Sequence, residues 1–114
     1  MSATIYKISE EGTGPVNVSF TVPVSRVYRL HSASIKFNTA PVTSESLTIT
    51  YNALAGVNYD VLLYTVNPSI TSITSLIWKP DELQYLHGED RIDIFYNNND
   101  NRTWGVQIIV EEVA

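Results

Sequence analysis

The chain has 114 residues, which is the size of one domain and is long enough to bury a core without cross-links. It has no cysteine, which excludes disulfides and thiolate metal sites, and its net charge of −5 argues against general nucleic-acid binding, which needs a basic face. Charged residues make up only 17% of the chain, so Ser, Thr and Asn must complete the surface unless a partner covers part of it.

The N-terminal region contains two candidate strands. Residues 3–9 form a short strand, which residues 10–15 should end because they include two glycines and a proline. Residues 16–24 alternate well, and Pro23 predicts a strand end or a sheet edge, because proline cannot donate to a ladder. We interpret residues 1–15 as either a short strand or an arm that pairs with a neighbouring subunit.

The middle of the chain predicts three further strands. In residues 26–38 the apolar phase slips near His31–Ser32, which indicates a β-bulge that keeps both halves facing the core. After a polar connector, residues 47–52 alternate strictly. Residues 59–66 are apolar on both faces for part of their length, which is typical of a central strand buried on two sides.

The C-terminal third has the clearest pattern. Residues 73–78 and 83–86 predict two short strands, and residues 91–96 alternate with Ile92, Ile94 and Tyr96 on one face. In residues 103–111, Trp104 shares a face with three branched aliphatic residues and should belong to the core. The run Asn97–Asn101 between them predicts a hairpin loop, because Asn and Asp tolerate the left-handed backbone region.

These patterns predict one all-β domain over residues 1–114. They give eight or nine short strands separated by turn signals, without a convincing helix. Such spacing is typical of a two-sheet antiparallel β-sandwich, and the order fits a jelly roll.

The sequence gives little support for catalysis or metal binding. Two histidines, His31 and His87, are present, but no G-x-S-x-G nucleophile elbow accompanies them. The Asn97–Asn101 loop offers hard oxygens but only one carboxylate, so a turn explains it better than a calcium site does. We expect no catalytic residue, no cofactor and no metal.

Exposed aromatic residues are the better candidates for function. Most aromatic side chains fall in the inward phase of their strands, whereas Tyr85 and Phe95 are out of phase and should be exposed. Together with Asn98, Asn99 and Asp100 of the hairpin loop, they form a candidate interaction surface. Exposed aromatic rings can anchor a protein interface or stack on sugars, and both interpretations stay open here.

Four stretches carry a resemblance to a known family: Thr43–Thr50, Tyr59–Tyr64, Trp78–Asp81 and Leu86–Ile94. Over roughly residues 26–110, the chain resembles small all-β virion proteins of tailed bacteriophages. The resemblance implies a non-enzymatic structural protein, either a capsid decoration or cement protein or a small tail or fibre component, and such proteins often act as trimers. Its partners would be copies of itself and a major capsid or tail protein.

The expected location follows from the same reasoning. The resemblance implies a place in the virion. No run of about 18 apolar residues predicts a membrane helix, and no signal peptide is evident, so we expect assembly in the host cytoplasm without a membrane partner. The alternative, from a different class, is a carbohydrate-binding β-sandwich module that recognises a host surface as part of a tail or fibre.

Overall fold

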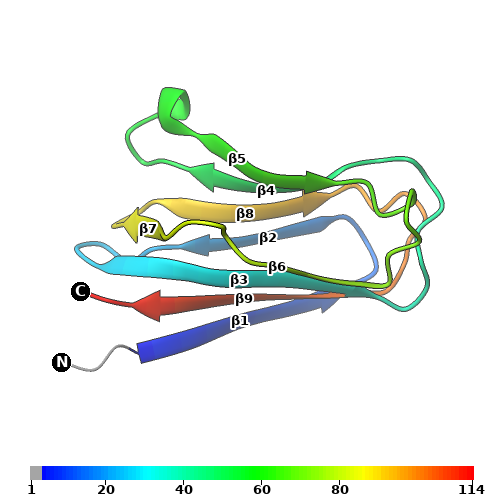
Figure 1. Ribbon diagram of the computed structural model, residues 1–114, viewed down its shortest axis with the longest axis horizontal. Coiled ribbons are helices and arrows are strands. Elements are labelled where there is room, and N and C mark those ends of the chain that lie inside the picture. The colour runs from blue at the N-terminus through cyan, green and yellow to red at the C-terminus, as the bar shows by residue number, and fades with distance from the viewer. Residues whose placement is uncertain (1–3) are drawn as a thin grey trace.

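The computed structural model describes residues 4–114, which form nine strands in two antiparallel sheets (Figure 1). Ala3 of the first predicted strand lies outside the described residues. The larger sheet contains, in order, β1 (Thr4–Gly12), β9 (Trp104–Glu112), β3 (Val27–Phe37) and β6 (Ser75–Trp78), with β7 (Gln84–His87) also paired to β3. The smaller sheet contains β2 (Val16–Thr21), β8 (Arg91–Tyr96), β4 (Leu47–Asn52) and β5 (Val61–Val66). A short 3₁₀ helix, Val57–Tyr59, precedes β5.

The strand order is that of a jelly roll. β6 and β7 pair with successive parts of β3, Leu76 opposite Ile35 and Gln84 opposite Leu30, so they act as two halves of one strand. If β6 and β7 count as one strand, β8 becomes the seventh strand and β9 the eighth. The larger sheet then has the strand order 1-8-3-6 and the smaller sheet 2-7-4-5, and the chain passes from one sheet to the other at most connections. The predicted β-sandwich with jelly-roll order is therefore confirmed.

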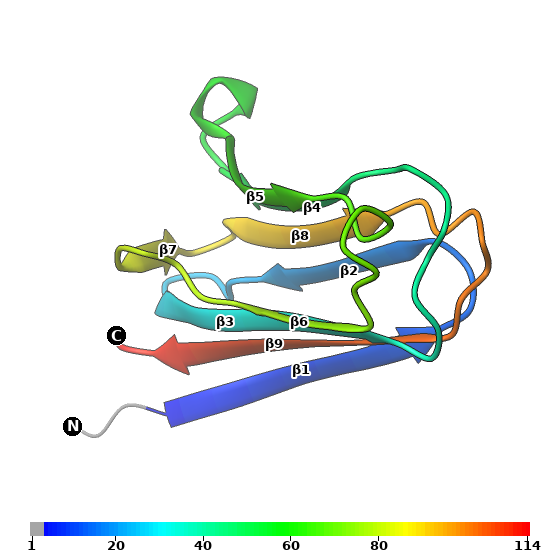
Figure 2. The ribbon, with the colours of Figure 1, turned by 45° about the vertical axis from the view of Figure 1, so that its right-hand side comes forward.

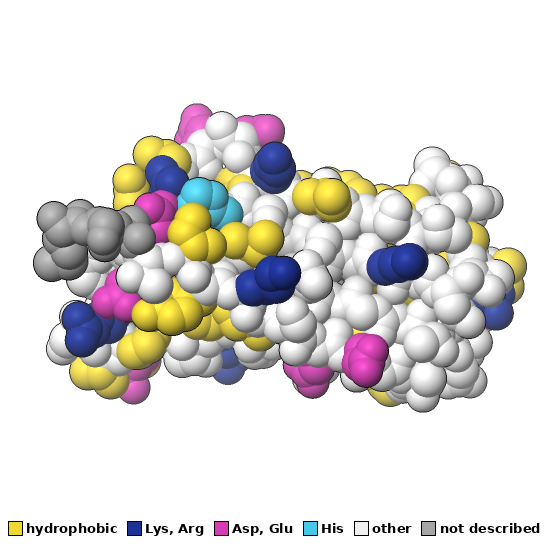
Figure 3. Space-filling view, turned by 90° about the horizontal axis from the view of Figure 1, so that it is seen from below, with side chains coloured by type: hydrophobic (Ala, Val, Ile, Leu, Met, Phe, Trp, Pro, Cys, Tyr) yellow, Lys and Arg dark blue, Asp and Glu magenta, His cyan; other side chains and the backbone are white. Residues whose placement is uncertain are grey.

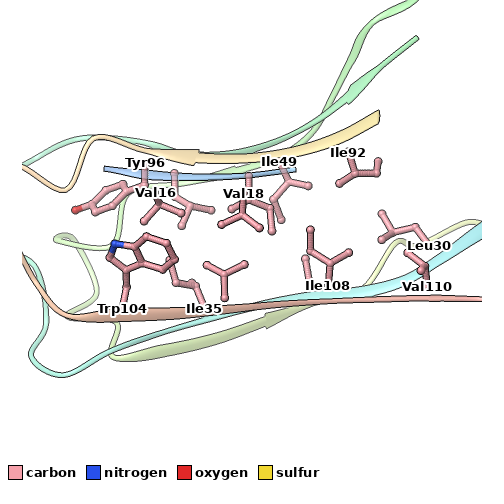
Figure 4. Packing of buried hydrophobic residues seen from close by; sticks show 14 of the residues in the cluster. Val16, Val18, Leu30, Ile35, Ile49, Ile92, Tyr96, Trp104, Ile108 and Val110 are labelled. Carbon is pink, nitrogen blue, oxygen red and sulfur yellow. The ribbon is translucent and has the colours of Figure 1, made fainter. Parts of the chain in front are cut away.

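The core lies between the two sheets, where the alternating apolar side chains meet (Figure 4). Val16 and Val18 of β2 and Ile108 of β9 are fully buried. Trp104 is also buried, as predicted, and its indole Nε1 donates a hydrogen bond of 2.8 Å to the Gly14 carbonyl. Full burial of each such side chain stabilises the fold by about 1.5–3 kcal/mol. Most core residues are those that the strand alternation places on the inward face.

The predicted bulge in the long third strand is confirmed. The register between β3 and β9 shifts between Leu30 and Ser32, so that Leu30 pairs with Val110 and Ser32 pairs with Ile109. The extra residue, His31, lets apolar residues on both sides of the shift face the core. The bulge therefore lets both ends of the long strand β3 face the same core.

Two predictions about strands are wrong. The first strand does not end at residue 9, because Glu10, Glu11 and Gly12 continue the pairing with β9, and the turn comes afterwards. The strand at residues 59–66 is not central: β5 pairs only with β4 at the edge of its sheet, and Val61 and Leu62 are exposed. Its apolar character on both faces therefore has another cause than burial within this chain.

β1 lies at the opposite border of the molecule from β5 (Figures 1 and 2). It pairs with β9 of the same chain, and most of its side chains are exposed. Exchange of this strand between copies, as an arm, stays a prediction.

Candidate interaction surface

The three predicted loop residues fasten one end of the sandwich. Asp100 accepts hydrogen bonds from the backbone N–H groups of Val42 and Thr43, at 2.9 and 2.8 Å, and from the Thr43 hydroxyl. These hydrogen bonds hold the pKa of Asp100 below its ordinary value, and the bond from the Thr43 N–H has the largest effect. Asn99 donates from its backbone and its side chain to the carboxylate of Glu45. Both residues thus join the β8–β9 loop to the connector after β3.

Asn98 has a purely internal set of contacts. Its side chain is 1% exposed, and its amide donates to the carbonyls of Thr13, Gly14 and Arg102. Its carbonyl accepts a hydrogen bond from the Arg102 N–H at 3.0 Å. Asn98 therefore offers no exposed side chain to a partner, although sequence alone placed it on the candidate surface.

Tyr85 and Phe95 are exposed as predicted, at 46% and 42%, but the structure separates them. Tyr85 lies on β7 opposite Arg29 in the larger sheet, and Phe95 lies on β8 opposite Asn17 and Thr48 in the smaller sheet. Because each ring points away from its sheet's core face, the two cannot contact one small ligand together. Their participation in an interface stays a prediction.

His31 belongs to an ionic cluster on the outer face of the larger sheet. Its Nε2 lies 2.9 Å from Glu111 Oε1, which also accepts a hydrogen bond of 2.6 Å from Arg29. The hydrogen bond with His31 has the largest effect on the pKa of Glu111 and, together with the charge of Arg29, holds it below its ordinary value although desolvation acts to raise it. The histidine is therefore engaged by a carboxylate and a guanidinium, not by a hydroxyl nucleophile.

Within residues 4–114, no group of three or more His, Asp or Glu side chains is arranged to hold a metal ion. Over the same residues, no helix has the length and apolar character required to cross a membrane.

The most prominent surface feature lies on the β4–β5 hairpin, which rises away from the body of the sandwich (Figures 1 and 2). It carries five large apolar side chains whose exposed fractions range from 51% to 82%: Leu54, Val57, Tyr59, Val61 and Leu62. We call these five residues the hairpin surface. Large apolar side chains that are exposed together on one hairpin are candidates for an interaction site.

Polar contacts hold the hairpin in this shape. The Asp60 carboxylate accepts a hydrogen bond of 2.8 Å from the Ala53 N–H, which closes the loop. The Leu54 N–H donates to Asp90 at 3.0 Å, which fastens the loop to the β7–β8 turn. Gly56, at φ 133°, supplies a backbone conformation that side chains disfavour. The apolar side chains are thus displayed on a fixed loop.

The residues of the hairpin surface are not among those that the sequence pattern predicts as functional. The signal of this surface is present in residues 53–58, where Leu54 and Val57 lie on either side of Gly56 in a loop with only one polar residue, Asn58. The two-faced apolar run of β5 was attributed to burial inside the domain, whereas its first residues belong to this exposed surface.

Two of the surface hollows bear on ligand binding. One, of about 630 Å³, lies on the outer face of the larger sheet, where Gly105 leaves the floor without a side chain and Ser34, Lys36 and Gln107 surround it. The other, of about 580 Å³, lies between β5 and β6 and includes Tyr64 and Trp78, whose rings stack at 5.7 Å and 23°. The first has no aromatic lining, so only the second has rings on which a sugar could stack.

Charge is sparse on the surface, as the composition predicts. Seen from the side of β1 and β9, the acidic and basic side chains are scattered among uncharged ones and form no dense basic patch (Figure 3). A surface finished mainly with uncharged groups suits close packing against other protein subunits more than it suits binding to a charged polymer.

No protein-family model matches the chain, and no curated protein matches it. Among solved structures, the chain is similar to one described as the acidic stable capsid structure of Helicobacter pylori bacteriophage KHP30. The two chains share 12% sequence identity over 96% of this chain and 94% of the other, with a TM-score of 0.47. Likeness at this level does not show a family, and the fold of this chain is established by its own strand order.

Proposed function

We propose that this chain is a non-enzymatic structural protein of a bacteriophage particle, a capsid decoration or cement protein that acts through protein–protein contacts. The observation that carries the proposal is the hairpin surface, because exposed apolar side chains on a fixed loop are a feature of sites that bind another protein subunit. The resemblance of residues 26–110 to small virion proteins of tailed bacteriophages is the reason to propose a bacteriophage particle.

The other features support an assembly role. Among the described residues, the buried polar side chains Asp90 and Asn98 make hydrogen bonds that hold the fold together. The loop residues Asn98 and Asp100 stabilise the fold, so they are not free to act on a substrate. The sparse charge also favours packing against neighbouring subunits.

Sedimentation with empty capsids of the phage that encodes the chain tests this proposal. We expect saturable binding, and we expect the double variant Val57→Lys with Tyr59→Lys to bind roughly tenfold more weakly, since loss of about 1.4 kcal/mol has that effect. Val42→Lys is the matched control, because Val42 is equally exposed but lies outside the hairpin. Protein that stays unbound at every capsid concentration would contradict the proposal.

A second candidate function is sugar binding at the hollow between β5 and β6. The stacked Tyr64 and Trp78 lie beside Asp81, Glu82 and Gln84, which could bond sugar hydroxyls. A glycan array with the wild-type chain and Trp78→Ala separates the two functions. Glycan binding that Trp78→Ala removes would favour a host-recognition module, and an empty array would exclude it.

A further inference from the structure

A small hollow of about 330 Å³ lies at the base of the β4–β5 hairpin. Two segments line it: the hairpin, with Leu54, Val57 and Asp60, and the β7–β8 turn with the start of β8, which contribute Glu89 and Arg91. This volume is at the lower end of the range of about 300–1,000 Å³ for pockets that hold whole small ligands. The hollow therefore has room for a single long side chain of a partner, and two residues of the hairpin surface form its apolar wall.

The hollow is negatively charged. Asp60 and Glu89 line it, and the buried Asp90 lies next to it, since its carboxylate accepts a hydrogen bond from the Leu54 N–H. The ion pairs of residues 4–114 include none of these three carboxylates. Three negative charges beside an apolar wall are therefore left without a cation of the described chain.

Arg91 lines the hollow but does not balance these charges, because it is engaged elsewhere. Its Nε lies 2.8 Å from a carboxylate oxygen of Asp93 on β8. Ser19 and Asn52 also donate hydrogen bonds to Asp93, which hold that carboxylate in place. Since Arg91 and Asp93 neutralise each other, the lining of the hollow stays acidic.

The chemistry of the lining favours an organic cation over a metal ion. Among the described residues, no group of three or more His, Asp or Glu side chains is arranged to hold a metal ion. Leu54 and Val57 add nothing to a metal site, whereas they can cover the apolar stem of an arginine or lysine side chain. Of these two, arginine is enriched at protein interfaces, and its weakly hydrated guanidinium has five donors for carboxylates that come from separate segments.

We infer that this hollow receives an arginine side chain of a partner protein, and that apolar neighbours of that arginine cover the rest of the hairpin surface. The stem of the arginine lies against Leu54 and Val57, and its guanidinium binds Asp60 and Glu89. This deepens the proposed function, on which it rests for the partner being a virion subunit, by giving the chemistry that the partner presents to the hairpin.

Charge complementarity selects this partner over a purely apolar one. Any cover over Leu54 and Val57 also removes water from Asp60 and Glu89, which line the same hollow. Burial of a carboxylate without a partner is costly, so an apolar patch alone is a poor cover, whereas an arginine supplies the missing cation. The net charge of −5 acts in the same direction, because it repels acidic surfaces, including those of other copies of this chain, and attracts basic ones.

Titration with the peptide acetyl-Leu-Arg-Leu-amide, followed by NMR of the backbone amides, tests the inference without any capsid. We expect saturable shifts of the amides of Leu54, Val57 and Glu89, with a Kd of about 1–10 mM, which corresponds to the contact of one side chain and its neighbours. The same peptide with citrulline in place of arginine has the same shape without the charge. It should bind roughly three- to tenfold more weakly.

The double variant Asp60→Asn with Glu89→Gln makes the matching change on the protein. Asparagine keeps a carbonyl group for the Ala53 N–H, so the hairpin should keep its shape, which the amide spectrum checks. This variant should bind the arginine peptide as weakly as the wild type binds the citrulline peptide. Asp81→Asn with Glu82→Gln is the control, because it removes the same two charges from exposed positions between β6 and β7 and should leave binding unchanged.

The outcomes separate this inference from the proposed function. Equal binding of the arginine and citrulline peptides, shifts that the Asp60 and Glu89 double variant retains, or no binding of the arginine peptide up to about 50 mM would overturn the arginine site. Capsids that bind this double variant as tightly as the wild type would also overturn it, while they uphold the decoration role. Conversely, arginine-selective binding by a chain that ignores capsids would uphold the site and contradict the decoration role.

Discussion

Tyr51 donates a hydrogen bond of 2.5 Å to the carboxylate of Asp90, which joins β4 to the turn between β7 and β8. The same carboxylate accepts the backbone N–H groups of Leu54 and His87, both at 3.0 Å. Asp90 is almost completely buried, so these three donors replace the water that an exposed carboxylate would have. This one side chain fixes the base of the β4–β5 hairpin, and with it the orientation of the hairpin surface.

Replacement of Asp90 by Asn should destabilise the fold. The amide removes the negative charge and turns a donor toward groups that are donors themselves, so at least one hydrogen bond is lost. We expect a decrease of about 2–4 kcal/mol in the free energy of unfolding, measured by urea denaturation. Asp81→Asn, at an exposed position, should change it by less than about 0.5 kcal/mol. Equal stability of the two variants would refute the role of Asp90.

Acid should destabilise the wild-type chain through the same residue. Burial raises the pKa of Asp90, but the hydrogen bonds from Tyr51, Leu54 and His87 outweigh it and bring the pKa below 3.8. Because the folded state favours the carboxylate, its contribution is complete above the unfolded pKa and is lost as pH falls through the folded pKa. Between about pH 4 and pH 2, the melting temperature should fall less steeply in Asp90→Asn than in the wild type. Parallel slopes would argue against this.

Asn98→Asp should have a large effect on stability. The substitution replaces an amide that donates to three carbonyl groups with a carboxylate that repels them. We expect a loss of about 3 kcal/mol or more by chemical denaturation, because a buried charge with only the Arg102 N–H as a donor is costly. Asn97→Asp is the control, since Asn97 is exposed next to it, and it should stay within about 0.5 kcal/mol of the wild type. A stable Asn98→Asp variant would show that the loop can open.

Gly88→Ala tests the packing of the β7–β8 turn. A Cβ atom at Gly88 would lie 2.8 Å from the backbone nitrogen of Ser25 and 3.3 Å from the Pro23 carbonyl, so the backbone would have to move. The expected cost is about 1–3 kcal/mol in the free energy of unfolding. Gly105→Ala makes the same change where no atom lies within 4 Å, and it should be nearly neutral. The opposite order of stability would contradict this packing.

Much of the fold could be predicted because its cause is local. Alternation with a period of two identifies which side chains of a strand share a face, and it predicted the burial of Trp104 and the exposure of Tyr85 and Phe95. The phase slip at His31–Ser32 predicted the bulge in β3, since only an added residue keeps both halves facing inward. The number of strands and the sandwich follow from the spacing of such segments.

The candidate surface could be predicted only in part. Asn98 and Asp100 have the residue types of an exposed loop, yet both bond to segments more than 50 residues away in sequence, Asn98 to the β1–β2 turn and Asp100 to the connector after β3. No local pattern records such partners. The same holds for Asp90, which reads as a turn residue and is in fact a buried acceptor of three hydrogen bonds.

By itself, the sequence determined that this chain forms short strands, which face of each strand is apolar, and where the turns fall, because these depend on neighbours along the chain. The tertiary structure decided which strands lie at the edges, and so placed the apolar β5 at a border of the sandwich with its hairpin exposed. Strand order depends on pairing between distant segments, which the alternation within one strand does not record, so the apolar run of residues 59–66 has the same pattern at the centre of a sheet and at its edge.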